Sequence, residues 1–255
     1  MLKTSLFKIS SEKLNLSEKI RIVQLSDLHK KKFGDKNEIL INSVKNASPD
    51  YIFITGDMIS RNVADLSDFK HLINELLKIA PVYYSLGNHE KDLEKLDAGL
   101  YSELIFTIQE KCVLLDNSNA KITIENKTIE IKGLTIFSEC YKNNGSYKNL
   151  RKLETKDILS LIGEKSENFC ILLAHNPMFF NSYAEYGADL VLSGHVHGGC
   201  VRLPVLGAVL SPERKFFPKY SKGLYKKSGT EMIVSAGLGK FRMFNPPEII
   251  VIDIQ

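Results

Sequence analysis

Five short apolar runs of this chain are each followed, one to three residues later, by an Asp, Asn or His. Runs of this length that contain β-branched residues are typical of buried strands. In an α/β sheet, sites are built beyond the carboxyl ends of the strands. We therefore expect five polar side chains to converge at one edge. The runs are Ile20 to Leu25, Tyr51 to Thr55, Val82 to Leu86, Phe169 to Ala174 and Ala188 to Ser193, and the side chains are those of Asp27, Asp57, Asn88, His175 and His195.

Strand and helix patterns alternate in the first half of the chain, which predicts parallel strands joined by crossover helices. The second half is richer in strands and predicts a second, more mixed sheet. No linker divides the chain between the first and last candidate site residues, so we expect one domain over residues 1–255. The helical patterns lie at Lys36 to Ala47, Asp65 to Ile79, Gly99 to Lys111 and Glu154 to Ile162, and the other strand runs at Cys112 to Leu115, Thr128 to Phe137, Glu231 to Ser235 and Glu248 to Ile254.

Five of the six histidines lie in short motifs with Asp, Asn and Gly, and only His71 falls outside them. Neutral imidazole and carboxylate are ligands that divalent metals prefer, so this concentration indicates a metal site. A catalytic ion keeps positions open for water and substrate, and the candidate ligands are too many for one such ion. We predict two ions, with ligands from Asp27, His29, Asp57, Asn88, His175, His195 and His197.

Each motif taken singly also has an ordinary structural interpretation. Asp27 is compatible with a solvated loop, Asp57 with a turn and Asn88 with a helix cap. His175 resembles a structural histidine at a strand end, and the pair that begins at His195 resembles an exposed His-x-His. The metal site would be wrong only if every one of these structural interpretations were correct at the same time.

The composition excludes several other classes of protein. The net charge of +4 suits an anionic substrate but does not require nucleic acid. The four cysteines form no Cys-x-x-Cys pair, which favours a reduced, cytoplasmic setting over a disulfide framework. The first eight residues contain no long apolar run, so we expect neither a signal peptide nor a membrane anchor. Peripheral contact with a membrane stays open.

The order of the motifs resembles that of the calcineurin-like metallophosphoesterases. The set Asp-x-His, Gly-Asp, Gly-Asn-His, His and Gly-His-x-His begins at Asp27 and ends at His197. Four later segments resemble the bacterial YaeI-like phosphodiesterase branch: Arg202-Leu203-Pro204, Phe217 to Tyr220, Gly223 to Tyr225 and Phe244 to Ile249. The chain departs from common patterns at Glu90, at Cys200 and at Ser138-Glu139-Cys140.

The resemblance implies an α/β fold, a four-layer α/β/β/α sandwich of two mixed sheets flanked by helices. It also implies that Asp57 bridges the two ions and that His89 faces the substrate phosphate without being a ligand. The first ion would be held by Asp27, His29 and His197, and the second by Asn88, His175 and His195.

The predicted activity is hydrolysis of a phosphodiester or pyrophosphate bond by in-line attack of a metal-bridging hydroxide, with Asp57 and His89 as catalytic residues. The alternatives are a phosphomonoesterase that acts on small metabolites or phosphoprotein, and a metal-binding scaffold without turnover. Manganese is the first candidate for both ions, with iron or zinc as alternatives, because a mixed nitrogen and oxygen ligand set does not choose between them.

Several basic residues bear on the substrate, which we expect to be small and phosphorylated, or linked to a lipid or nucleotide. Arg202 is a candidate phosphate contact or a surface ion-pair partner. The run Lys30 to Lys32 is a solvated face or a means of steering an anion. The segment Arg214 to Tyr220 is a packed loop or a contact for lipid headgroups. We expect no stable nucleic-acid complex, and the oligomeric state stays open.

Overall fold

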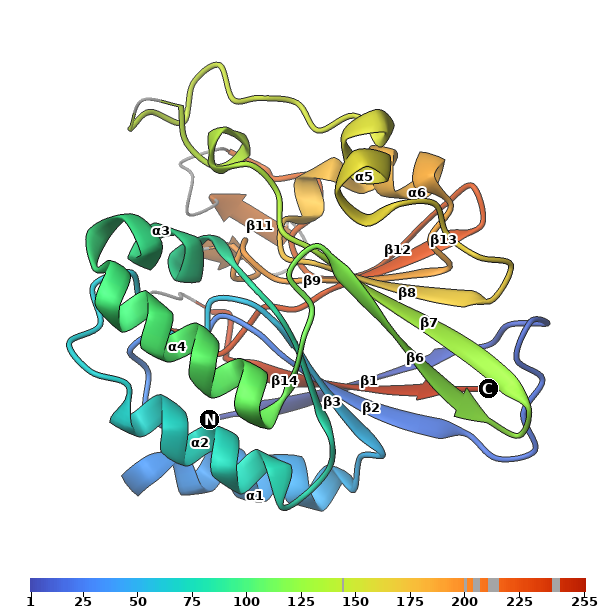
Figure 1. The fold of residues 1–255 in the computed structure, drawn as a ribbon, viewed down its shortest axis with the longest axis horizontal. Helices are drawn as coiled ribbons and strands as arrows, with labels where there is room; N and C mark the ends of the chain where they lie inside the picture. The colour runs from blue at the N-terminus through green and yellow to red at the C-terminus, as the bar shows by residue number, and fades with distance from the viewer. Residues whose placement is uncertain (144, 200, 204–206, 211–215, 240–243) are drawn as a thin grey trace.

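Two six-stranded sheets form the centre of the molecule (Figure 1). The computed structural model describes residues 1–255 except 144, 200, 204–206, 211–215 and 240–243, so Cys200, Pro204, Arg214 and Lys215 lie outside the described residues. In spatial order, the first sheet contains β1 (Lys3–Ile9), β14 (Glu248–Ile254), β2 (Ile20–Leu25), β3 (Tyr51–Thr55), β4 (Val82–Ser85) and β5 (Val113–Leu114). The second contains β12 (Gly223–Lys227), β13 (Thr230–Val234), β9 (Leu190–Ser193), β8 (Phe169–Ala174), β7 (Lys127–Leu134) and β6 (Ser118–Ile124).

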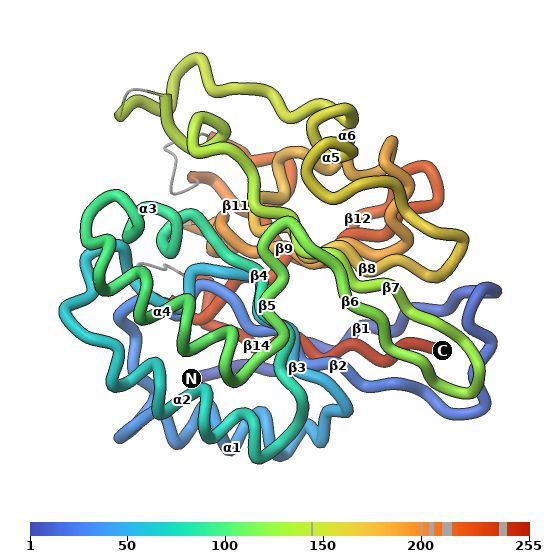
Figure 2. Tube along the Cα trace, in the orientation of Figure 1, coloured from blue at the N-terminus to red at the C-terminus, as the bar shows by residue number. Residues whose placement is uncertain are grey.

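Both sheets are mixed. Strands β2, β3, β4 and β5 pair in parallel, as the alternation of strand and helix predicts. The C-terminal strand β14 is inserted between β1 and β2, parallel to the first and antiparallel to the second, which Figure 2 traces. In the second sheet the inner strands are parallel and both edge strands are antiparallel. A short antiparallel pair, β10 (Val201–Leu203) and β11 (Gly207–Leu210), follows β9 along the chain.

Helices cover the outer face of each sheet and complete four layers (Figure 1). On the first sheet these are α1 (Glu38–Ala47), α2 (Ser67–Leu77), α3 (Asn88–Leu96) and α4 (Ala98–Lys111). On the second they are α5 (Thr155–Ile162) and α6 (Phe180–Tyr186). Short 3-10 turns lie at η1 (Asp35–Asn37), η2 (Ser138–Cys140) and η3 (Pro177–Phe179). The predicted four-layer α/β/β/α sandwich is confirmed.

The layers follow from the two-residue period of the strands. In β3, Ile52 and Ile54 pack under the helices while Phe53 points between the sheets. In β8, Ile171 lies between the sheets and Leu172 under the helices of the other side. Successive strand residues face opposite ways, so a strand that is apolar at every position is buried on both faces. The continuous apolar runs therefore define the two central sheets.

Several elements differ from the sequence predictions. The helix expected from Lys36 begins at Glu38, because Lys36 and Asn37 have φ values of 46° and 64°. The strand expected to reach Phe137 ends at Leu134. Seven further strands and helices were not predicted: β1, β6, β10, β11, β12, α3 and α6. Strand β1 is an edge strand that begins with three polar residues and leaves Leu6 exposed. None of the described helices has the length and apolar character that crossing a membrane requires.

Candidate metal centre

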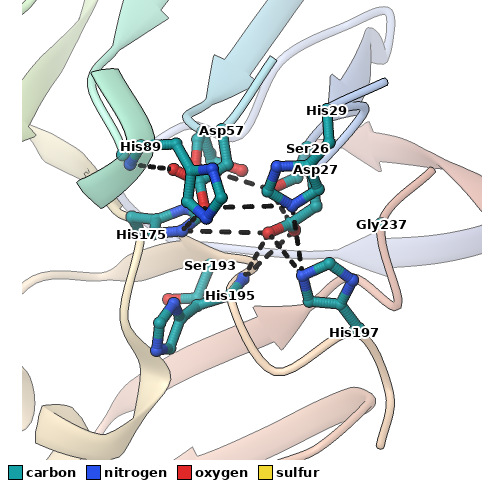
Figure 3. Close-up of polar contacts among 12 residues, drawn as sticks. Ser26, Asp27, His29, Asp57, His89, His175, Ser193, His195, His197 and Gly237 are labelled. Carbon is teal, nitrogen blue, oxygen red and sulfur yellow. Dashed lines mark hydrogen bonds and ion pairs between the residues drawn. The ribbon is translucent and has the colours of Figure 1, made fainter. Parts of the chain in front are cut away.

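The predicted site residues meet at the carboxyl ends of strands from both sheets (Figure 3). The first sheet contributes the loops after β2, β3 and β4, and the second contributes those after β8 and β9. The structure brings the polar residues of all five loops together. They are Asp27, His29, Asp57, Asn88, His89, His175, His195 and His197.

The loops carry these side chains on unusual backbone. Asp27, His29, Asp57, His195 and His197 all have positive φ, between 53° and 68°. This left-handed conformation is uncommon outside glycine, although Asp, Asn and His adopt it more readily than most residues. It clusters at functional sites because surrounding contacts must hold it in place. Here those contacts include hydrogen bonds from one site loop to another, as from Asp27 N to the Gly56 carbonyl at 3.0 Å.

Glycines let the site loops approach one another closely. A Cβ at Gly194 would overlap Ser26 Oγ and Asp27 Oδ2, and a Cβ at Gly87 would overlap Asp57 Oδ1. A Cβ at Gly237 would lie 2.7 Å from Asp27 Cβ. The carboxylates are therefore packed against bare backbone, which leaves them little freedom to move away.

One cluster of possible ligand atoms surrounds Asp27. Nε2 of His197 lies 3.5 Å from Asp27 Oδ1 and 3.3 Å from His29 Nε2. The rings of the two histidines are nearly parallel, with an interplanar angle of 5°. These three residues can offer one ligand atom each within a sphere suited to a single ion.

A second cluster contains His175, His195 and Asp57, and a third joins Asp57 to His29 and His89. Oδ2 of Asp57 lies 3.2 Å from His175 Nε2 and 4.0 Å from His29 Nε2. Asp57 therefore faces both groups of histidines, with its side chain only 2% exposed. Next to this cluster, the buried Oδ1 of Asn88 has no hydrogen-bond partner in the described part of the chain. A buried polar atom without a partner is unfavourable unless water or a cation satisfies it.

The tautomer of His175 indicates what the second cluster needs. Nδ1 of His175 lies 2.6 Å from the Thr55 carbonyl, which can only accept, so Nδ1 carries a hydrogen. In the neutral ring Nε2 is then a lone pair that faces a carboxylate oxygen of Asp57. Two acceptors at this distance require a proton or a cation between them. An N–H donated to a backbone carbonyl is also the usual arrangement of a metal-binding histidine.

The charges of the site favour a cation as well. Burial disfavours the charged form of His175, but Asp57 and Asp27 outweigh burial and raise its pKa to about 10. Burial alone would raise the pKa of Asp57, yet the histidines around it hold this pKa well below its usual range. A metal ion competes with protons for the same lone pairs. The residues present therefore fit a divalent cation.

His89 differs from the other histidines because its two nitrogens face donors. The backbone N–H of Arg61 donates to His89 Nδ1 at 3.1 Å, so the neutral ring carries its hydrogen on Nε2. Burial lowers the pKa of His89 to about 3, against the opposing charge of Asp57. Nη2 of Arg61 lies 2.8 Å from this Nε2. Two donors thus converge beside Asp57.

Arg61 is a site residue that the sequence motifs did not identify. Its guanidinium forms an ion pair with Asp92 at 2.6 Å, and both residues line a cavity of about 380 Å³ that opens from His89. Its only signal in the sequence is a cation four residues after Asp57. The predicted substrate contact, Arg202, is not among the described residues that line this cavity. Its Nη1 donates to the carbonyl of Gly198, the residue after His197, at 3.3 Å.

Two residues of the C-terminal segment, Asn245 and Glu248, hydrogen-bond to the backbone of loops that carry or pack on the site residues. Nδ2 of Asn245 donates to the His197 carbonyl at 2.6 Å. Oε1 of the buried Glu248 accepts the backbone N–H of Ala236, in the loop that packs on Asp27. In the sequence, Phe244 to Ile249 resembles the YaeI-like phosphodiesterase branch, but that resemblance assigns the segment no role.

Comparisons with known proteins identify the family to which the chain belongs. The family model for the calcineurin-like phosphoesterases matches residues 20–199. An uncharacterised metallophosphoesterase of Campylobacter jejuni is 30% identical over 254 residues, which cover 94% of this chain and 60% of the relative. Phosphodiesterase YaeI of Escherichia coli is 24% identical over 242 residues, covering 92% of this chain and 82% of the relative.

The fold is also found among solved structures. Sulfate thiohydrolase SoxB of Thermus thermophilus aligns with a TM-score of 0.54 at 12% identity, covering 89% of this chain and 53% of that protein. The chain thus spans about half the length of this structural neighbour and 60% of the Campylobacter relative. The likeness to SoxB concerns the fold alone. The ordered motifs, the four-layer fold and the family match together show that this chain belongs to the calcineurin-like phosphoesterases, a family of metal-dependent hydrolases of phosphoric esters.

Proposed function

We propose that this chain uses a dinuclear metal centre to hydrolyse a phosphodiester or a pyrophosphate bond. The candidate ligands divide into two sets that share Asp57. Asp27, His29 and His197 form the first set, and Asn88, His175 and His195 the second.

The observation that carries this proposal is the position of Asp57 between the two sets. One carboxylate oxygen lies within 4.0 Å of a histidine nitrogen from each set. On the second side it faces Nε2 of His175, which offers a lone pair to a cation when the ring is neutral, because the hydrogen on Nδ1 goes to the Thr55 carbonyl. A carboxylate that meets imidazoles on two sides is suited to hold two cations at once.

Two divalent ions, when bound, supply charge for the phosphoryl oxygens and lower the pKa of the attacking water. The chain itself supplies the donors that receive the substrate. His89 presents Nε2–H beside Asp57, and the Arg61 guanidinium lies next to it. An anionic phosphoryl oxygen between them would satisfy both donors. With a pKa of about 3, His89 is neutral near pH 7, so its Nε2–H acts as a hydrogen-bond donor to the phosphoryl or leaving oxygen.

Elemental analysis of protein purified without added metal tests the centre itself. We expect two divalent ions per chain, with manganese as the first candidate and iron or zinc as alternatives, since the ligand types do not decide. The activity test compares an aryl phosphomonoester, an aryl phosphodiester, a cyclic nucleotide and a nucleotide sugar with Mn²⁺. A preference for the diester or the nucleotide sugar supports the proposal. A preference for the monoester makes the chain a phosphomonoesterase, and no turnover with both ions bound makes it a scaffold.

The Asp57→Asn variant tests the bridging role. We expect loss of turnover and a fall in metal affinity of about 100-fold or more, given that changes to residues behind metal ligands already cost 10–100-fold. Asp68→Asn is the control, because Asp68 is exposed and, in the described part of the chain, forms an ion pair with Lys32 alone. An Asp57→Asn protein with full activity and metal content would contradict the proposed centre.

A further inference from the structure

The cavity beside the metal centre is larger than a phosphoryl group needs. Its volume of about 380 Å³ falls in the range of small-molecule sites. One end is formed by metal-centre residues, among them His89 and His195. The other end is formed by the last turns of α3 and by the segment after η2, which includes Tyr141 and Lys142. The outer end must receive whatever part of the substrate extends beyond the attacked phosphate.

Two cations at this outer end have no carboxylate partner among the residues that the structure describes. Of the basic residues that line the cavity, Arg61 is paired with Asp92 and Lys91 with Glu94, each at 2.6 Å. In the described part of the chain, Lys95 and Lys142 form no ion pair. Nζ of Lys95 donates to Ser138 Oγ at 3.1 Å, and Nζ of Lys142 lies 5.4 Å from the centre of the Tyr147 ring.

Neither contact satisfies a lysine fully. An ammonium has three donors, of which the Ser138 hydroxyl uses one on Lys95, and an aromatic face is a weak partner at an exposed site. Glu139 is the remaining carboxylate of the described lining outside the metal centre. The outer end therefore offers unused positive charge, and the strongest partner for an ammonium is a phosphate or carboxylate.

Tyr141 connects the two ends of the cavity. Its ring lies edge-on to His195, with centroids 5.0 Å apart, and it precedes Lys142 in the chain. Its neighbour Cys140 is buried and packs in the core under α5, which anchors this wall of the cavity. A substrate that binds its reacting phosphate at the metal centre must pass Tyr141 to reach Lys95 and Lys142.

We infer that Lys95 and Lys142 form a subsite for a second phosphate group, so that the substrate is a pyrophosphate-linked compound such as a nucleoside diphosphate sugar. This inference rests on the proposed function and selects between the two bonds named there. In the reaction, the water oxygen bonds to the attacked phosphorus and the bond from that phosphorus to the bridging oxygen breaks. The bridging oxygen leaves on the second phosphate. The products are two phosphomonoesters, and the protons of the water end on them or in solvent.

The test compares two substrates that differ in the second phosphate. UDP-glucose contains it, whereas the p-nitrophenyl ester of thymidine 5′-monophosphate is a nucleoside phosphodiester without it. Both are assayed with Mn²⁺-loaded protein, as wild type and as the double variant Lys95→Ala/Lys142→Ala. We expect the double variant to lower kcat/KM for UDP-glucose about tenfold more than for the thymidine ester, mainly through KM, because each lysine contributes a charge-assisted contact.

A matched control separates this subsite from general electrostatic steering. Lys121→Ala/Lys127→Ala removes the same charge from the exposed β6–β7 hairpin and should change neither substrate. An equal effect of Lys95→Ala/Lys142→Ala on both substrates overturns the subsite, as does hydrolysis of the thymidine ester without hydrolysis of UDP-glucose. A wild-type protein that hydrolyses neither compound, nor any aryl ester, overturns the proposed function and the subsite with it. Both double variants are surface changes, and their melting temperatures verify that they fold.

Discussion

The buried carboxylate of Glu90 accepts the backbone N–H of Asp57 at 2.8 Å. The same carboxylate accepts the N–H groups of Met58 and Gly87 and the hydroxyl of Tyr84, at 2.9, 3.0 and 2.9 Å. It thus joins the start of α3 to the loop after β3. Asp57 has a left-handed backbone conformation, and this contact from α3 helps to hold it in place.

Glu90→Gln is expected to weaken metal binding through Asp57. In either orientation the amide presents an NH₂ group to two donors that the carboxylate satisfied, which costs roughly 2 kcal/mol or more of unfolding free energy. We expect metal affinity to fall about 10–100-fold, measured by titration of the apoprotein with Mn²⁺. Glu130→Gln is the control, since Glu130 is buried and accepts from Ser166 away from the centre. Equal metal affinities in the two variants would show that Glu90 supports the fold alone.

Gly194→Ala tests the close packing around Asp27. The new Cβ would overlap both Ser26 Oγ and Asp27 Oδ2, and neither can retreat because both residues are fully buried. We expect a variant that no longer gains thermal stability when Mn²⁺ is added, whereas the wild type gains it because the metal binds only the folded state. Gly99→Ala is the control. The nearest atom to its new Cβ would be Asp97 Oδ1 at 3.5 Å, an ordinary van der Waals contact, and Ala should stabilise α4 by up to about 1 kcal/mol. A metal-dependent rise in Tm for Gly194→Ala would contradict this packing argument.

Asn245→Ala should separate metal binding from stability. The substitution removes the donor to the His197 carbonyl, so the turn that carries His195 and His197 loses a contact from the C-terminal segment. We expect a loss of about 1–2 kcal/mol in unfolding free energy together with a metal affinity lowered about tenfold. Asn37→Ala should lose stability alone, because buried Asn37 accepts from Phe33 N and does not contact the centre. The measurements are urea unfolding of the apoproteins and metal titration; unchanged metal affinity in Asn245→Ala would refute its role.

The ion pair at the end of β14 predicts a pH dependence of stability. Hydrogen bonds from Arg21, opposed by burial and aided by Lys19, lower the pKa of Asp253 to about 2. A carboxylate whose pKa falls on folding stabilises the protein above its unfolded pKa, near 3.8, and this stabilisation is lost as the pH falls toward 2. Asp253→Asn should therefore be less stable than wild type at pH 7, by about 1–2 kcal/mol. Urea unfolding from pH 7 to 3 should show this difference shrink below pH 4, and a difference that grows with acid would contradict it.

The sequence was sufficient to predict the central strands of both sheets and the polar residues that follow their carboxyl ends. Apolar runs such as Tyr51 to Thr55 form strands because each face of each central sheet is covered, so both strand faces must be apolar. Polar residues placed directly after such runs, as Asp57 is, lie at the strand ends whatever the loop conformations are. Helix α3 escaped prediction because its few apolar residues, of which Leu93 is buried, give a weak periodic pattern.

Contacts between distant segments were not predictable in the same way. Asn245 reaches His197 across 48 residues, and Arg61 reaches His89 across 28. Nothing in the local sequence of either partner specifies such a pair, because the pairing depends on how loops from separate strands are folded beside one another. The same holds for Lys95 and Lys142, which become neighbours of one cavity only when α3 and the segment after η2 pack together.

The sequence by itself therefore determined the fold class, the family and the candidate ligands, because hydrophobic periodicity and short motifs act over a few residues. Only the tertiary structure decided how the possible ligand atoms group around Asp27 and Asp57, that Nε2 of His175 faces Asp57, and which cations line the cavity. These properties depend on distances of a few ångströms between side chains far apart in the chain. Such distances exist only once both sheets and their loops are packed.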